Sequence, residues 1–284
     1  MWNGKKKAIT FSYDDGVVQD IRFVQLLNKY HIRGTFNLNS GLEAYVWLYE
    51  DRFPVRRQIL SETVEQYRGH EIASHSLHHP WLNSLTPPQL RREAQEDAEA
   101  IKAIFGLEEI GFGVPFTACD AREVNILRKI VRYIRLSEFA DSFALPKDEY
   151  HIPIHGLYND PEIREKIAAF GENSLPASLF VMAGHSYEFE MLGHWEYIED
   201  LNVSAVNALL TEESQEPIAI SIPIIDNFSY NAGYSKPYFW DNYKEYLGFY
   251  SSYRLYDFTR SVNSANTQNI VQAYENAEEK MKEK

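Results

Sequence analysis

The sequence predicts an α/β protein whose parallel sheet closes into a (β/α) barrel. Short runs of β-forming residues alternate with amphipathic stretches over roughly 200 residues. Each run precedes a helical stretch, and parallel strands need such crossover connections. About seven strand–helix units fit a closed barrel better than an open sheet. In such barrels the chemistry lies on the loops that follow the strands.

The N-terminal half supplies the first units in order. The first strand is rich in β-forming residues and ends at the turn Asp14-Asp15-Gly16, and the first helix carries an apolar stripe. The third strand, Glu71–Ser74, leads into a loop rich in histidine. The strands are expected at 7–13, 33–38 and 71–74, and the helices at 17–30 and 59–67.

The next helix has the clearest boundaries in the sequence. Thr86 is expected to be its N-cap, Pro87 suits the first turn, and Gln89 completes a capping-box pattern. Gly106 supplies a suitable C-terminal stop. We therefore expect a helix of about five turns between these signals.

Weaker strand–helix pairs complete the alternation. The strands are expected at 110–114, 133–136, 178–183 and 218–224, and a loop follows the second of them. The helices are expected at 121–131, from Asp160-Pro161 onward, and at 195–210. The composition changes after this point, because residues 228–258 contain thirteen aromatic side chains. We therefore expect a barrel domain over 1–225 and an aromatic-rich extension over 226–284 that packs on the barrel.

Composition excludes several classes of partner. The 284 residues include 28 basic and 41 acidic side chains, a formal net charge of −13, which argues against nucleic acids and anionic membranes. No run approaches the ~20 apolar residues of a membrane span. Cys119 is the only cysteine, so neither an intrachain disulfide nor a thiolate zinc site can form. Because no signal peptide is visible, a cytoplasmic protein is the default expectation, although a secreted protein without its leader would look the same.

Two polar clusters follow predicted strands. Asp14-Asp15-Gly16 alone is also ordinary turn sequence, and the pair His75 and His79 alone would also suit a surface loop. Together they offer one carboxylate and two imidazoles, which is the donor set of catalytic zinc centres with open coordination positions. The neighbouring carboxylate is then free to accept a proton from water.

Three motifs in order carry a family resemblance: Thr10-Phe-Ser-Tyr-Asp-Asp-Gly16, Gly34-Thr-Phe36 and Glu71-Ile-Ala-Ser-His-Ser-Leu-His-His-Pro80. They resemble the motifs of the polysaccharide deacetylase family, which comprises the NodB homology domain and carbohydrate esterase family 4. The first motif has Ser-Tyr inserted before its aspartates. Weaker matches are Gly113-Val-Pro-Phe116 and the strand from Leu179 to His185. The resemblance covers roughly residues 7–225.

The resemblance implies a distorted (β/α)7 barrel and a role for each matching residue. Asp15, His75 and His79 would hold a divalent metal, with Zn²⁺ foremost and Co²⁺, Ni²⁺ or Mn²⁺ as alternatives. Asp14 would be the general base, and His185 the general acid that protonates the leaving amine. The implied reaction is hydrolysis of an N-acetyl group, sometimes an O-acetyl group, on an acetylated saccharide.

The sequence departs from the family at Gly113, where the family has an arginine that orients the catalytic aspartate. Arg135 is our candidate substitute, and Arg132 is the next. The carboxylate that orients the acid histidine is not identified, and Asp141 and Asp148 are the candidates considered.

Substrate contacts are expected from Pro115, Phe116, Tyr187 and Arg135. The leading prediction is a metal-dependent carbohydrate deacetylase. One alternative is an amidase of the same superfamily that acts on a small amide or cyclic ureide. Another is a catalytically impaired carbohydrate-binding relative, a hypothesis motivated by the missing arginine. The sugar, its chain length and the oligomeric state are not predicted.

Overall fold

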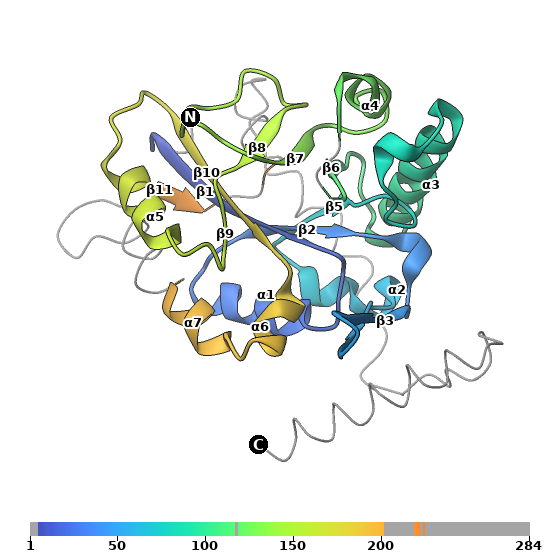
Figure 1. Cartoon of the computed structure of the whole chain (residues 1–284), viewed down its shortest axis with the longest axis horizontal. Coiled ribbons are helices and arrows are strands. Elements are labelled where there is room, and N and C mark those ends of the chain that lie inside the picture. The colour runs from blue at the N-terminus through green and yellow to red at the C-terminus, as the bar shows by residue number, and fades with distance from the viewer. Residues whose placement is uncertain (1–4, 117–118, 202–218, 222–223, 225–284) are drawn as a thin grey trace, which may run out of the picture.

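The computed structural model describes residues 5–116, 119–201, 219–221 and 224, and its centre is a parallel sheet (Figure 1). The strand order is β8-β7-β6-β5-β2-β1-β10-β9, and β11 also pairs with β1. The strands are β1 (Lys7–Asp14), β2 (Gly34–Leu38), β5 (Glu71–Ser74), β6 (Gly111–Gly113), β7 (Ile134–Phe139), β8 (Ile152–Ile154), β9 (Gly156–Leu157), β10 (Ser178–Gly184) and β11 (Ala219–Ser221).

One short segment joins the two ends of this sheet. β8 pairs in parallel with β7, and β9 pairs in parallel with β10. Between them, the amide of His155 donates to the carbonyl of Val181 at 2.8 Å. The sheet therefore curls into a nearly closed barrel, which confirms the predicted fold class. The sequence predicted only a loop here, because strands of two and three residues are too short to show a period of two.

Helices surround the barrel (Figure 1). Figure 1 shows α1, α6 and α7 grouped at one side, while α3 lies beside α4 at another. The helices are α1 (Asp20–Lys29), α2 (Leu60–Thr63), α3 (Pro87–Phe105), α4 (Ala121–Leu127), α5 (Ile163–Glu172), α6 (Ser186–Met191) and α7 (Trp195–Asp200). Single turns of 3₁₀ helix occur at Ser40–Leu42, Val64–Tyr67 and Leu82–Ser84.

The boundary signals of α3 are confirmed. The amide of Thr86 donates to Oε1 of Gln89 at 3.0 Å, and Gly106 ends the helix in the left-handed conformation with φ +67°. The helix expected to open at Asp160 begins later, at Ile163. Oδ1 of Asp160 instead accepts from the amide of Glu162 at 3.0 Å, which forms a turn before the helix.

An antiparallel hairpin that the sequence did not predict is inserted between β2 and β5. It consists of β3 (Val46–Tyr49) and β4 (Phe53–Arg56). The chain after the hairpin returns to the end of β1, where the amide of Gln58 donates to the carbonyl of Gly16 at 2.8 Å. The hairpin is thereby attached to the loop that begins at Asp15, directly after Asp14 ends β1.

Alternation along the strands separates two buried faces. In β1, Ile9, Phe11 and Tyr13 join the large apolar core, while Ala8 belongs to a separate apolar cluster with Leu179 and Val181. Polar side chains follow on the same face as Ala8, namely Thr10, Ser12 and Asp14, all buried. Because side chains alternate along a strand, the polar side chains of β1 all face the inside of the barrel. The last of them is Asp14.

None of the helices in the described part of the chain has the length and apolar character that a membrane crossing requires. The predicted extension over 226–284 lies outside the described residues. The proposed domain boundary near 225 therefore stays a prediction.

Candidate active site

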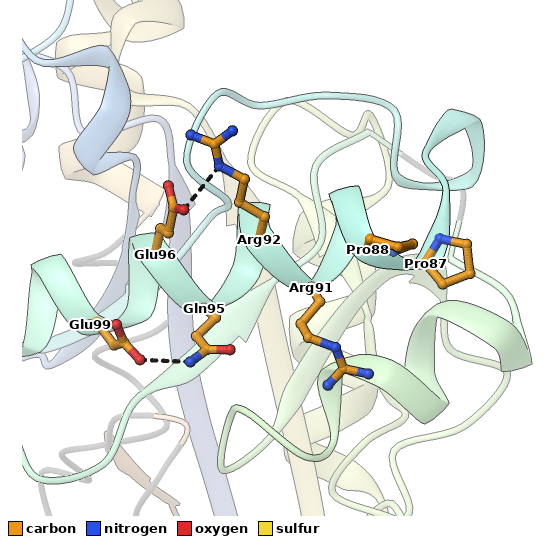
Figure 2. A pocket seen from close by; sticks show the side chains of 7 residues that line it. All are labelled: Pro87, Pro88, Arg91, Arg92, Gln95, Glu96 and Glu99. Atoms are coloured by element: carbon orange, nitrogen blue, oxygen red, sulfur yellow. Dashed lines mark hydrogen bonds and ion pairs between the residues drawn. The ribbon is translucent and has the colours of Figure 1, made fainter.

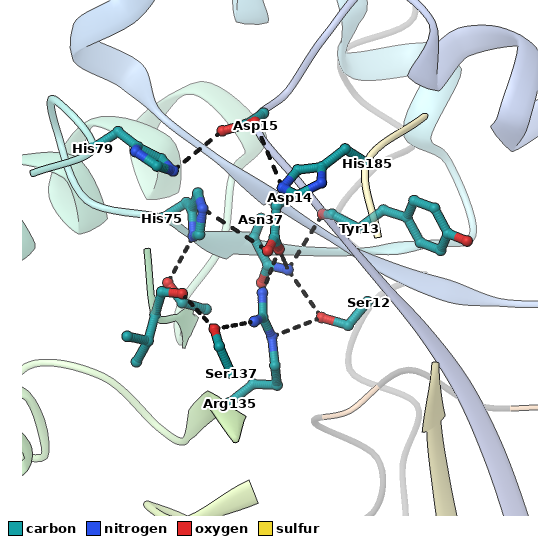
Figure 3. Close-up of polar contacts among 12 residues, drawn as sticks. Ser12, Tyr13, Asp14, Asp15, Asn37, His75, His79, Arg135, Ser137 and His185 are labelled. Carbon is teal, nitrogen blue, oxygen red and sulfur yellow. Dashed lines mark hydrogen bonds and ion pairs between the residues drawn. The ribbon is translucent and has the colours of Figure 1, made fainter. Parts of the chain in front are cut away.

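Three of the predicted ligand residues meet at one end of the barrel (Figure 3). Asp15 directly follows β1, and His75 directly follows β5. One ligand atom each from Asp15, His75 and His79 lies within 4.8 Å of the others. Nε2 of His79 is 3.4 Å from Oδ1 of Asp15. One carboxylate and two imidazoles, clustered at this spacing, fit a divalent transition-metal ion.

The protonation states of this group suit ligation. Nδ1 of His75 is 2.8 Å from the carbonyl of Gly113, so this nitrogen carries the proton and Nε2 is free to bind. Burial lowers the pKa of His75 to about 3, against the opposing effect of Asp14, and keeps the ring neutral. Burial alone would raise the pKa of Asp15, but Arg57 outweighs it and the net pKa lies far below the usual range. Neutral imidazole and ionised carboxylate are the forms that bind metals.

The hydrogen-bond donors that the described residues offer to Asp14 all bind the same oxygen (Figure 3). Oδ1 accepts from Nδ2 of Asn37 at 2.7 Å and from Nη2 of Arg135. Ser12 supports both donors, since its hydroxyl accepts from Asn37 at 2.9 Å and from Nε of Arg135 at 3.2 Å. Oδ2 faces Nε2 of His75 at 3.9 Å. Burial raises the pKa of Asp14, but Arg135 and then His75 outweigh it, so the net pKa is lowered.

Arg135 reaches Asp14 across the position of Gly113. Gly113 pairs with Arg135 in the register of β6 and β7. A Cβ atom at residue 113 would lie 2.6 Å from Cγ of Asn37 and 2.7 Å from Nη2 of Arg135. The guanidinium therefore occupies space that a side chain at 113 would take. Arg132, the other candidate, instead pairs with Glu149 at 2.9 Å.

His185 lies on the other side of Asp15 from His79 (Figure 3). Its Nε2 is 3.9 Å from Oδ2 of Asp15, and its Nδ1 is 3.2 Å from Oε1 of Glu188. Burial alone would lower the pKa of His185, but the hydrogen bond to Glu188 and the charge of Asp15 raise it to about 9. The partner carboxylate is thus neither of the two candidates named from the sequence, because Asp141 is exposed and Asp148 pairs with His151 at 3.1 Å.

Four residues at this site have strained backbone. Asp15, Ser76, His79 and Phe116 all have positive φ, at +88°, +65°, +53° and +56°. Such a conformation is uncommon outside glycine, and it is costly for a bulky residue such as phenylalanine. Strain of this kind persists where the surroundings fix it, and it gathers at functional sites.

Aromatic rings flank the two outer histidines. Phe116 packs its ring against His79 and stacks on Trp81, with centroids 4.1 Å apart and planes within 4°. Trp81 and Phe116 are 49% and 39% exposed, while Pro115 beside them is buried. On the other side Tyr187 stacks on His185 and is itself covered by the hairpin. An exposed aromatic surface therefore adjoins the His79 side of the site.

A separate hollow lies on the outer face of α3 (Figure 2). Its polar side chains pair along the helix, Arg92 with Glu96 and Gln95 with Glu99. These are ordinary pairs of a solvated helix face. The hollow contains none of the predicted site residues, and Pro87, which lines it, was named from the sequence only as a helix-start signal.

Sequence reasoning missed several residues that contact the predicted ones, among them Asn37, Glu188 and Arg57. Asn37 carried a weak signal, an amide in a buried strand, because polar groups are placed there only with partners. Glu188 carried a local signal, because a residue three positions after His185 can reach its ring within one helical turn. Arg57 carried no signal, since it follows a hairpin that the pattern did not reveal.

Comparison with known proteins relates the chain to one family. The family model described as polysaccharide deacetylase matches residues 2–131. Among solved structures, a putative polysaccharide deacetylase from Mycobacterium smegmatis is 14% identical with a TM-score of 0.57, covering 81% of this chain and 91% of its own. The chitin deacetylase of the fungus Colletotrichum lindemuthianum is 20% identical with a TM-score of 0.50, covering 78% and 86%.

These two likenesses concern the fold, and a search of curated sequences finds no match. The segment that matches the family model, residues 2–131, contains Asp14, Asp15, His75 and His79. Through this segment the chain is similar to the polysaccharide deacetylase family.

Proposed function

We propose that this protein is a metal-dependent deacetylase that hydrolyses the N-acetyl group of an acetylated saccharide. The observation that carries the proposal is the meeting of Asp15, His75 and His79 beside a spare carboxylate, Asp14. A divalent ion held by the three ligands, with Zn²⁺ first among the candidates, would supply a Lewis acid for the amide carbonyl and lower the pKa of a water.

Asp14 is the proposed general base. Both donors from Asn37 and Arg135 occupy Oδ1, so Oδ2 is the oxygen left to accept a proton. The lowered pKa of Asp14 keeps the carboxylate ionised at neutral pH, as a base requires. Arg135 acts here as a positioning residue, because it fixes which oxygen of Asp14 is available.

His185 is the proposed general acid. Glu188 holds the Nδ1 side of the ring, which leaves Nε2 as the atom that faces the site near Asp15. With its pKa raised to about 9, the imidazole carries a proton at neutral pH and can donate it to the leaving amine. An amine is a poor leaving group until it is protonated, so this step needs an acid.

The exposed stack of Trp81 and Phe116 supports a saccharide substrate. The apolar C–H face of a pyranose ring suits an aromatic face, and this surface adjoins His79. Pro115 and Tyr187 would then shape the site, the first as buried support for Phe116 and the second as cover for His185.

The contact between Arg135 and Asp14 weighs against the non-catalytic alternative. That hypothesis rested on the missing arginine at Gly113, and a guanidinium is present at Asp14 from the neighbouring strand. An amidase of small amides or ureides would use the same groups, so only substrate selection separates it from the deacetylase.

The test is acetate release by the purified full chain, measured after metal analysis and reloading with Zn²⁺. The panel contains N-acetylglucosamine, its tetrasaccharide, an O-acetylated xylo-oligosaccharide, a simple N-alkyl acetamide and a cyclic ureide scored by ring opening. We expect turnover of an acetylated saccharide that stops on chelation. Turnover of only the acetamide or ureide would establish the amidase alternative, and bound saccharide without turnover would establish a binding protein.

A further inference from the structure

Two buried side chains connect the loops that carry the proposed metal ligands. Nη1 of Arg57 donates to the carbonyl of Asp15 at 2.5 Å and also to Oδ1 of Asn39, while Nη2 donates to Oδ1 of Asp15 at 2.8 Å. Nδ2 of Asn39 donates to the carbonyls of His75 and Ser76, each at 2.6 Å. A continuous chain of hydrogen bonds thus runs from the loop after β1 to the loop after β5.

The geometry of this Arg57–Asn39 pair suits positioning. Asp15 has a φ of +88°, so its backbone needs support from outside the strand, and Arg57 holds both its carbonyl and its carboxylate. The guanidinium is itself kept in place, since it lies over the ring of Trp47 at 5.0 Å from the centroid. A planar fork with five donors can make these bonds together, whereas a lysine ammonium offers one point of contact.

Because Arg57 is positively charged, metal affinity can distinguish a positioning role from a purely electrostatic one. A full positive charge lies 2.8 Å from a carboxylate oxygen that is proposed to bind a dication. Electrostatic repulsion alone predicts that removing the arginine strengthens metal binding. If Arg57 instead orients Asp15, removing the arginine weakens metal binding, because groups that orient metal ligands typically contribute 10- to 100-fold in affinity.

We propose that Arg57 and Asn39 are positioning residues of the metal centre, and that the hairpin β3–β4 places Arg57 beside Asp15. The inference rests on the proposed metal site and adds to it the elements that hold its ligands in register. Arg57 follows β4 directly, and its own amide is bonded to the carbonyl of Tyr45 at 2.9 Å at the base of the hairpin.

The test is the affinity of the metal-free full chain for Zn²⁺, measured by competition with a chromogenic chelator. The variants are Arg57→Ala, Arg57→Lys and Asn39→Ser, each checked for folding by circular dichroism. We expect Arg57→Ala to bind Zn²⁺ about tenfold or more weakly than the wild type. Arg57→Lys keeps the charge, and we expect it to bind weakly as well.

Arg52→Ala is the matched control, because Arg52 lies in the turn of the same hairpin and pairs only with exposed Glu50 among the interactions described. We expect its Zn²⁺ affinity to equal that of the wild type. Unchanged or tighter binding by Arg57→Ala overturns the inference, and if that variant does not fold, unchanged binding by Asn39→Ser does so. A wild-type chain that binds no Zn²⁺ would instead remove the proposed metal centre itself.

Discussion

The guanidinium of Arg135 and the missing side chain of Gly113 are two parts of one arrangement. Residues 113 and 135 face each other in the register of β6 and β7, and a Cβ atom at 113 would lie 2.7 Å from Nη2 of Arg135. Because Gly113 has no side chain, the guanidinium of Arg135 can reach Asp14. An arginine expected on one strand is supplied by the next strand, with a glycine in the vacated place.

This arrangement predicts that Arg135→Ala lowers the rate and moves its pH dependence. Without the guanidinium, burial is opposed less strongly and the pKa of Asp14 rises. The base is then protonated up to a higher pH, so the acid limb of kcat/KM shifts upward and the rate at neutral pH falls by about 10²-fold. A pH–rate profile measures both effects, and a rate equal to that of the wild type contradicts the role of Arg135.

A second prediction separates the two aspartates. Asp14→Asn removes the base but none of the three ligands, so we expect turnover to be abolished while Zn²⁺ affinity stays within about tenfold, the lower end of the losses seen when only ligand support is altered. His79→Ala removes a ligand, and we expect it to lose the metal. Metal analysis and acetate release are measured on both variants. An equal loss of metal in the two would mean that the roles of Asp14 and Asp15 are exchanged.

A third prediction concerns the proposed acid. Glu188→Gln keeps a side chain near Nδ1 of His185 but removes the charge that raises its pKa. The histidine then loses its proton at lower pH, so the basic limb of the rate profile moves downward. Tyr187 stacks on the same ring and gives a comparison, since Tyr187→Phe keeps the stack. A basic limb that moves equally in both variants would argue against Glu188.

A fourth prediction links stability to pH through Asp20 at the start of α1. Its carboxylate accepts from Ser186 at 2.5 Å and from Tyr67 at 3.0 Å, and burial raises its pKa to about 7 despite both bonds. The unfolded chain releases this proton near pH ~4. Between these values the native state binds more protons, so the free energy of unfolding falls as pH rises from about 4 to about 7.

We therefore expect Asp20→Asn to flatten that part of the stability profile. Urea unfolding at pH 5 and at pH 8 measures it for the wild type and the variant. The wild type is expected to lose more stability than the variant between the two conditions. An equal loss in both proteins would show that Asp20 does not titrate in this range.

A fifth prediction tests the aromatic surface. Trp81→Ala removes the more exposed ring of the stacked pair. If a sugar beyond the acetylated one rests there, KM for a tetrasaccharide rises about tenfold, or ~1.4 kcal/mol. KM for N-acetylglucosamine stays the same because the monosaccharide does not reach the ring. An unchanged KM for both substrates would place Trp81 outside the binding site, and an equal rise for both would contradict the proposed contact with a more distant sugar.

Much of the fold followed from local patterns. The cap at Thr86 and the stop at Gly106 are strong short-range signals, and α3 has those boundaries. The strands β8 and β9 were missed because each is very short and pairs with a strand outside its own segment. The hairpin β3–β4 is local, but its four-residue strands are too short to show a clear alternation. Strands of two to four residues form only where a neighbouring edge completes their hydrogen bonds.

The residues of the candidate site also fall into those that local sequence patterns predicted and those that they did not. Asp14, Asp15, His75 and His79 stand next to strand ends and in short motifs, so the sequence pointed to them. Arg57 and Asn39 act through contacts that only the folded chain creates, such as the bond from Arg57 to a carboxylate 42 residues earlier. Arg135 was predicted through the family resemblance, as a substitute at the end of a predicted strand for the arginine that the family has at the position of Gly113.

The segment 152–157 has a consequence for how the molecule assembles. Its first half is paired to β7 and its second half to β10, so neither pairing alone completes the ring of strands. These pairings close short loops, since Ile152 pairs with Arg135 and Gly156 with Met182, whereas Lys7 in β1 pairs with Ser178 in β10. Contacts that join distant parts of a chain form late, because a long loop must first be closed. We therefore expect the pairing of β1 with β10 to form last during folding, and its amide hydrogens to gain protection from exchange after those of the segment 152–157.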